Sequence, residues 1–175
     1  GVQLTKRLKD SQVGNQIEAC DRPTGALVLY ILSPGKRLWC VATGTGLAPF
    51  LSIIRDQQTF ELFEEVIVTH TVRTTQELAY GDLLRSLPIT YYPTVTREPF
   101  ETPGRITERI DSGALWSDLS LTPWSVDEDR VMICGSPEFN KDLRSRLEGL
   151  GFTHGTNRAP GEFVQERAFV MQRAS

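Results

Sequence analysis

The sequence predicts an α/β fold built on a doubly wound parallel sheet, preceded by the last strands of an antiparallel β unit. From residue 37 onward, short apolar runs alternate with helical segments, which is the pattern of βαβ units. The first run is followed by a glycine turn, Gly44-Thr-Gly46, and then by a helix. Before residue 35 the chain alternates loosely between closely spaced turn signals, which is typical of an all-β unit.

The N-terminal segment is too short to close a barrel by itself. Two turn signals precede the apolar run 26–31, which we interpret as part of the β unit. Ser33-Pro-Gly35 interrupts both strand and helix, so we expect the linker there. The predicted division is therefore a β remnant at residues 1–34 and an α/β domain at residues 35–175.

Strands and helices follow one another through the first half of the α/β domain. The first strand starts at Arg37 and stops at Thr43, and Pro49 starts the next helix, since proline suits the first helical turn. The β-branched run 66–70 predicts a buried second strand. A helix over 76–87 and a third strand over 89–96, with its proline near one end, leave about one residue between them, shorter than usual. We expect either missing loop residues or an earlier helix end.

The second half repeats the pattern less regularly. Residues 107–111 predict a short helix, whereas 116–127 read as an irregular, proline-interrupted excursion. The run 130–134 predicts the fourth buried strand. A helix over 136–150 follows, because its first three residues supply a cap, a first-turn proline and a glutamate at the positive end. Residues 163–170 alternate enough to form a closing strand.

The composition indicates an ordinary soluble globular protein. The 175 residues are 39% hydrophobic and 23% charged, with a net charge of −3, so no basic excess suggests nucleic acid. No apolar run approaches the roughly 20 residues that cross a bilayer, and no leader opens the chain. Three widely spaced cysteines, Cys20, Cys40 and Cys134, fit neither a disulfide framework nor a metal site. We expect a cytoplasmic protein without a metal, whose partners are small molecules or proteins.

The glycine turn predicts a phosphate-binding site. Gly44 and Gly46 let the backbone turn sharply and lie against a bulky ligand, and the helix that follows presents free N–H groups to an anionic pyrophosphate. A Gly-x-Gly sequence is weak by itself, because loops of this composition are often only tight turns.

Three arginines follow the predicted strands or short loops. In dinucleotide folds, an arginine after the second strand accommodates an adenosine 2′-phosphate, and Arg73 stands there. Arg97 follows the third strand and Arg105 follows a Pro-Gly turn, and a guanidinium group binds phosphate through two N–H groups at once. Each alone is more simply explained as a solvated surface arginine. Together with a glycine phosphate turn they favour NADP(H) over NAD(H).

Cys134 ends the fourth strand at the edge of the sheet where α/β ligands gather. A thiol there would reach a nicotinamide, or it is simply a small buried hydrophobic residue. Cys40 lies inside its strand and is expected in the core. The acidic run 127–129 is interpreted as a solvated loop.

Several motifs in their order along the chain resemble the bacterial ferredoxin/flavodoxin NADP+ reductases. They are Gly44-Thr-Gly-Leu-Ala-Pro49, Arg73, Tyr91-Tyr-Pro-Thr-Val-Thr-Arg97, Cys134-Gly-Ser-Pro137 and Glu166-Arg-Ala-Phe-Val170. The resemblance runs from Gly1 to Val170 and implies an antiparallel FAD-binding barrel followed by a doubly wound NADP(H) domain. It further implies hydride transfer between NADPH and FAD, and single-electron transfer between FAD and ferredoxin or flavodoxin.

The resemblance also implies roles for single residues. Those matching the hydride-transfer site beside the nicotinamide and flavin are Cys134, Glu166, Ala168 and Phe169. Those matching the FAD and NADP(H) contacts are Leu4, Thr5, Thr24, Thr43, Gly44, Thr45, Gly46, Pro49, Val72, Arg73, Thr96, Arg97, Arg105, Gly135, Ser136 and Pro137. Ala168-Phe169 stands where plant members place a stacking tyrosine.

One departure from the family pattern leaves alternatives open. The Arg-x-Tyr-Ser motif, whose tyrosine stacks on the flavin ring in this family, is expected before residue 1 and is absent here. The main expectation is an enzyme, the C-terminal part of a ferredoxin NADP+ reductase that works as a monomer. The alternatives are a non-catalytic NADP-binding module and the reductase component of an oxygenase. The last usually brings an iron–sulfur cluster held by four cysteines, which three scattered ones cannot hold.

Overall fold

The computed structural model describes residues 11–16 and 25–168, which contain a five-stranded sheet in the order β3-β2-β1-β4-β5. All neighbouring strands pair in parallel. The strands are β1 (Arg37–Thr43), β2 (Glu65–Val72), β3 (Thr90–Val95), β4 (Asp129–Gly135) and β5 (Phe163–Arg167). The predicted α/β fold with a doubly wound parallel sheet is therefore confirmed.

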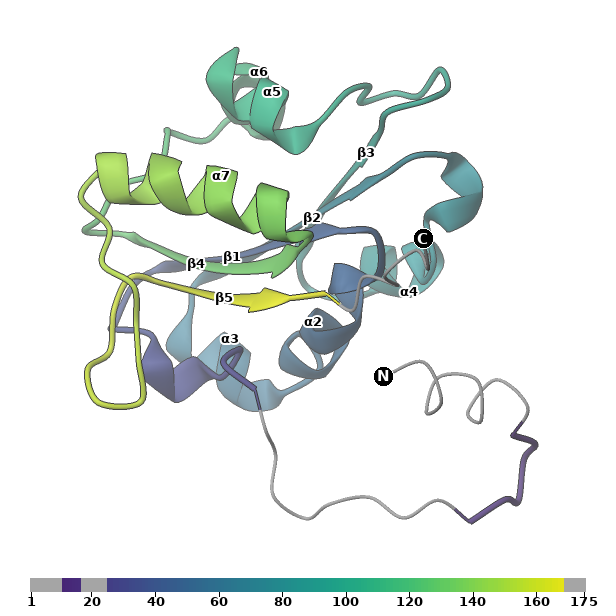
Figure 1. The fold of residues 1–175 in the computed structure, drawn as a ribbon, viewed down its shortest axis with the longest axis horizontal. Coiled ribbons are helices and arrows are strands. Elements are labelled where there is room, and N and C mark those ends of the chain that lie inside the picture. The colour runs from purple at the N-terminus through teal and green to yellow at the C-terminus, as the bar shows by residue number, and fades with distance from the viewer. Residues whose placement is uncertain (1–10, 17–24, 169–175) are drawn as a thin grey trace, which may run out of the picture.

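Helices cover both faces of the sheet (Figure 1). One side carries α2 (Ala48–Ile53), α3 (Gln57–Leu62) and α4 (Gly81–Ser86), and the other carries α5 (Ile106–Asp111), α6 (Ala114–Leu119) and α7 (Pro137–Gly149). The described residues also form the short 3₁₀ helices η1 (Leu29–Ile31), η2 (Gly44–Leu47) and η3 (Thr75–Glu77). The sheet is thus buried on both sides, which explains its nearly continuous apolar strands.

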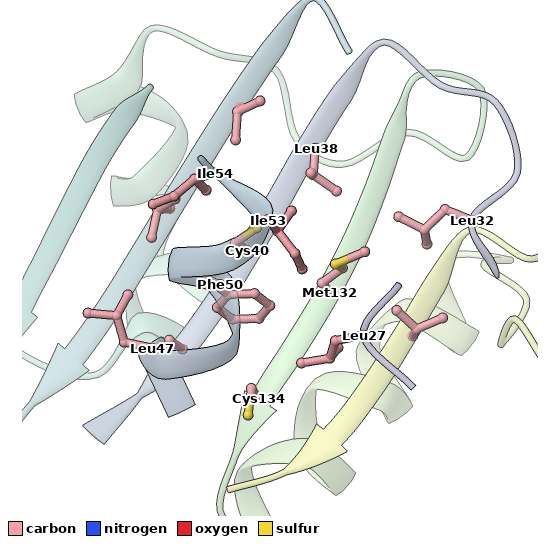
Figure 2. Packing of buried hydrophobic residues seen from close by; sticks show 14 of the residues in the cluster. Leu27, Leu32, Leu38, Cys40, Leu47, Phe50, Ile53, Ile54, Met132 and Cys134 are labelled. Atoms are coloured by element: carbon pink, nitrogen blue, oxygen red, sulfur yellow. The ribbon is translucent and has the colours of Figure 1, made fainter. Parts of the chain in front are cut away.

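Alternate residues of β1 supply two separate hydrophobic cores. Leu38 and Cys40 face α2 and α3, whereas Trp39 and Val41 face α5 to α7. Figure 2 shows the first core, in which Phe50 of α2 lies over the sheet near Cys40. All five residues are fully buried, so Cys40 belongs to the core as predicted.

The helix expected over 76–87 is wrong in its first half. Residues 75–77 form η3, and α4 begins only at Gly81. Tyr80 between them has a φ of 63°, which no helix interior accepts. The short junction is explained by an earlier helix end, because α4 stops at Ser86 and β3 starts at Thr90.

Two other interpretations of the sequence need correction. The excursion over 116–127 begins inside a helix, α6, which starts at Ala114 after Gly113 in a left-handed conformation. The acidic run 127–129 is not wholly solvated, because Asp129 is fully buried and bonded to Arg37.

The segment before the sheet also differs from the expectation. The apolar run 26–31 ends in the 3₁₀ helix η1 rather than in a strand. Leu32 then forms an isolated parallel bridge with Gly161. Within 11–16 and 25–36 no extended strand occurs, so the predicted barrel strands stay a prediction.

The remaining elements follow the sequence closely. Pro93 lies within β3, where a missing N–H is tolerated because β3 is an edge strand. In α7 the Ser136 hydroxyl accepts the N–H of Phe139, with Pro137 in the first turn, as predicted. Across the described part of the chain, no helix has the length and apolar character needed to span a bilayer.

Candidate functional site

The site lies where the chain reverses direction across the sheet. After β1 the chain adds β2 and β3 on one side, and it then returns to add β4 and β5 on the other side of β1. The loops after β1 and β4 therefore diverge at the carboxyl ends of two adjacent strands. In open α/β sheets this switch point is where ligands bind.

The glycine turn after β1 forms the floor of this crevice. Gly44 has a φ of +53°, a conformation that favours glycine, and the space beside its Cα is open. Gly46 has a different task, because a Cβ there would lie 2.1 Å from the carbonyl oxygen of Cys134. The turn thus packs closely against β4 at Gly46, whereas at Gly44 it faces the open crevice.

The end of β4 approaches β1 equally closely. A Cβ on Gly135 would lie 2.5 Å from Oγ1 of Thr43 and 2.4 Å from the Phe139 ring. Gly46 and Gly135 are buried and contribute by close packing, so neither lines the open cleft.

An open cleft of about 940 Å³ extends from the glycine turn along the carboxyl ends of the strands. It brings together most of the described residues that were expected to bind cofactor or to act beside it. Those that line it are Thr43, Gly44, Thr45, Val72, Arg73, Thr96, Arg97, Arg105, Ser136 and Ala168. Of the other described candidates, Gly46, Pro49, Cys134, Gly135, Pro137 and Glu166 do not line it. Leu4, Thr5, Thr24 and Phe169 lie outside the described residues.

The arginines converge on one wall of the cleft. Arg73 and Arg97 follow the adjacent strands β2 and β3, and the Arg97 N–H donates to the Arg73 carbonyl at 2.9 Å. Arg105 precedes α5 and lies beside the end of β3, because the Gly104 N–H donates to the Val95 carbonyl at 2.9 Å. All are exposed, and among the described residues none of their guanidinium groups forms an ion pair.

Two of the acidic residues in the cleft are bonded to the backbone of the arginine loops. Oε2 of Glu77 accepts the Arg73 N–H at 3.2 Å. Oε2 of Glu108 accepts the Arg105 N–H at 3.0 Å. These carboxylates hold the loops in shape and leave the guanidinium groups unpaired.

The acidic residues of α7 also have partners. Hydrogen bonds from its own backbone N–H and from Ser136 lower the pKa of Glu138. Asp142 pairs with Arg146 one turn along the helix. The cations that remain available in the cleft are therefore those of the arginine loops, which suits an anionic ligand.

Cys134 and Glu166 are paired in register on β4 and β5, just below the cleft. Cys134 is 2% exposed, and burial, helped by the nearby Glu166 carboxylate, raises the pKa of its thiol to about 11. It is therefore a neutral thiol at physiological pH, and it packs in the core against α2 one residue before the end of β4.

The backbone and side chain of Glu166 are both held. Its Oε2 accepts the N–H of Ala26 at 3.1 Å, which ties β5 to the segment before the sheet. Its carbonyl accepts Nδ2 of Asn140 in α7 at 2.7 Å. Glu166 thus stands at the junction between the α/β domain and the preceding segment.

Several lining residues were missed by the sequence analysis. They are Thr71, Glu77, Gly104, Ile106, Thr107, Glu108, Glu138, Phe139 and Asp142. Most lie at the starts of α5 and α7. In the sequence analysis, site residues were expected directly after strands, and that criterion does not find residues at the start of a helix. For Phe139 and Asp142, the spacing of three residues along α7 puts them on one helix face and was a usable signal.

Comparison with known proteins gives consistent matches. Residues 40–145 match the family model described as the oxidoreductase NAD-binding domain. The chain is 46% identical over 180 residues to the flavodoxin/ferredoxin–NADP reductase of Rhodobacter capsulatus, covering 95% of this chain and 67% of the relative. It is 43% identical to ferredoxin–NADP reductase A of Sorangium cellulosum, covering 98% of this chain and 66% of the relative.

A solved structure agrees with these relatives. The ferredoxin NADP+ reductase of Neisseria gonorrhoeae with bound FAD and NADP superposes with a TM-score of 0.76 at 32% identity. The match covers 83% of this chain and 61% of that one. The chain thus spans about two thirds of the length of the proteins it matches.

Proposed function

Because this chain belongs to the family of ferredoxin/flavodoxin–NADP reductases, we propose that it binds NADP(H) in the cleft and serves a flavin-dependent oxidoreductase. The observation that carries the proposal is the set of unpaired guanidinium groups of Arg73, Arg97 and Arg105 on one wall of the same cleft as the glycine turn. A pyrophosphate and a 2′-phosphate need these two kinds of donor.

Different residues of the cleft would bind different parts of NADP(H). Gly44 and Thr45 would meet the pyrophosphate, since the first N–H groups of a helical turn have no intrahelical partner. The arginines would hold the 2′-phosphate through paired N–H groups. The residues present therefore fit NADP(H), and Ala168 and Ser136 would stand on the nicotinamide side with Cys134 and Glu166 beneath.

For FAD, the expected phosphate contacts Leu4, Thr5 and Thr24 lie outside the described residues. When bound, FAD supplies hydride acceptance from NADPH and release of single electrons to a carrier. The chain itself would contribute position: Thr43 lines the cleft at the start of the glycine turn, and the neutral Cys134 thiol adds no charge beneath the proposed nicotinamide site.

The remaining parts of the proposal concern partner and setting. We propose ferredoxin or flavodoxin as the electron carrier, after the names of the relatives. We further propose a cytoplasmic monomer. The cytoplasmic part of this proposal is supported by Cys40 and Cys134, which are free and buried, as is usual for thiols in reducing compartments.

Two measurements on the purified chain test the proposal. Equilibrium titration is expected to give NADP+ at least about tenfold tighter than NAD+, because only NADP+ uses the arginine wall. The absorption spectrum is expected to contain a bound-flavin band. A colourless protein that still prefers NADP+ would indicate a non-catalytic NADP-binding module, and equal affinity for both nucleotides would reject the assignment of the arginines.

A further inference from the structure

His70 lies directly beneath the glycine turn and was not among the expected site residues. It is near the end of β2, next to Ala42 in the β1 register, and it is 1% exposed. Its Nε2 is 2.9 Å from the carbonyl oxygen of Gly44. A buried imidazole therefore contacts the residue whose positive φ opens the turn toward the cleft.

The contacts define the proton position on the ring. A carbonyl oxygen only accepts hydrogen bonds, so Nε2 of His70 must carry the proton. Nδ1 is then the acceptor, and it faces the Tyr91 hydroxyl at 3.5 Å. Burial lowers the pKa of His70 and raises that of Tyr91 to about 12, which keeps both groups neutral at physiological pH.

The bond to Gly44 orients the next peptide N–H. In a trans peptide the C=O and the following N–H point in opposite directions, and the described residues contain no cis peptide. With the Gly44 oxygen held inward by His70, the Thr45 N–H is directed away from the core. Thr45 is exposed and lines the cleft, so this N–H is directed toward the side on which a ligand would bind.

We propose that His70 is a positioning residue that fixes the Gly44–Thr45 peptide so that an N–H, and not a carbonyl, meets the pyrophosphate of the nucleotide. Glycine accepts φ of either sign at little cost, so the first peptide of η2 gains from a side-chain donor that holds the Gly44 carbonyl in its place. A rotated peptide would place a carbonyl dipole against an anion. The inference rests on the proposed NADP(H) site and adds the residue that prepares it.

The test separates the two ends of the nucleotide. NADP+ carries both the pyrophosphate and the 2′-phosphate, whereas 2′-AMP carries only the latter. His70→Leu removes the donor and is expected to weaken NADP+ by about tenfold or more, with 2′-AMP unchanged. His70→Gln keeps an N–H donor near the same place and should retain most of the NADP+ affinity. Arg73→Ala, by contrast, should weaken both ligands.

Each outcome decides the question. Wild-type binding of NADP+ by His70→Leu, or an equal loss for NADP+ and 2′-AMP, would overturn the proposal. If the unaltered chain binds neither ligand, the proposed function itself fails, and the inference fails with it.

Should His70→Leu not fold, nitrogen NMR of the unaltered protein gives an independent answer. The expected state of His70 at neutral pH is the Nε2–H tautomer, with the Thr45 amide shifting on addition of inorganic pyrophosphate. An Nδ1–H tautomer, or a Thr45 amide unaffected by saturating pyrophosphate, contradicts the proposal.

Discussion

Arg73, Arg97 and Arg105 differ from the ion-paired arginines elsewhere in the described chain in their lack of acidic partners. Arg146, for example, pairs with both Asp111 and Asp142. Among the described residues the arginines of the cleft wall have no such ion pair, although they lie in a protein of net charge −3. Their charge is therefore available to a ligand.

At Arg73 this leads to a selective prediction. Arg73→Ala should weaken NADPH by about 1.5 to 3 kcal/mol through loss of a charged hydrogen bond, with a much smaller effect on NADH. Fluorescence titration with both nucleotides measures the difference. Arg144→Ala is the matched control, because Arg144 is an exposed arginine already paired with Glu148. Equal weakening of NADPH and NADH would show that the 2′-phosphate lies elsewhere.

At the scale of elements, α7 illustrates how a local sequence sets both a helix and one side of the cleft. Ser136 ends the loop after β4, accepts the N–H of Phe139 at 3.2 Å and lines the cleft. Pro137 supplies the φ of the first turn, and Leu143 and Leu147 bury the inner helix face. One residue thus connects the start of a helix with the ligand site.

The cap predicts a measurable cost. Ser136→Ala should lower the free energy of unfolding by about 0.5 to 2 kcal/mol, because an N–H of the first turn loses its partner. Urea denaturation followed by circular dichroism gives this value. Ser145→Ala, an exposed position in the middle of the same helix, should be neutral or slightly stabilising, because alanine has the higher helix propensity. A Ser136→Ala protein as stable as Ser145→Ala would contradict the capping role.

At the scale of the whole molecule, the two ends of the parallel strands have different roles. The cleft lies at the carboxyl ends of the strands. At the opposite, amino ends a buried ionic cluster joins two of the strands. Asp129 bonds Nε of Arg37 at 2.8 Å, the Trp39 ring N–H at 2.7 Å and the Ser125 N–H at 2.8 Å. The cluster joins β1, β4 and the loop before β4.

This arrangement predicts that stability and nucleotide binding can be separated. Asp129→Asn should cost about 3 to 5 kcal/mol, toward the lower value because Glu128 remains 3.7 Å from Arg37. Asp127→Asn, in the same acidic run but exposed, should change stability by about 0.5 kcal/mol or less. Denaturant unfolding measures both.

The same variants provide a check on location. Where Asp129→Asn remains folded, its NADP+ affinity should equal that of the unaltered chain, because Asp129 lies at the edge of the sheet opposite the cleft. A large loss of affinity in a folded Asp129→Asn protein would mean that the ionic cluster at the amino ends of the strands affects nucleotide binding in the cleft.

Local patterns were sufficient for much of this protein. The strands, the glycine turn and the α7 cap depend on residues that are neighbours in the sequence, so periodicity and capping chemistry identified them. The placement of Arg73, Arg97 and Arg105 after strands or short loops also indicated a shared site, because parallel strands bring their carboxyl ends together.

The tertiary structure decided what depends on distant neighbours. Tyr80 interrupts the predicted helix through a left-handed backbone, Asp129 is buried because Arg37 and Trp39 meet it, and Gly46 is required because the Cys134 carbonyl lies against it. His70 acquires its task only because β1 and β2 pair in one register. The sequence alone determined the order and type of most elements. Which side chains are buried, paired or left free for a ligand follows from contacts between segments far apart in the chain, and no local pattern records them.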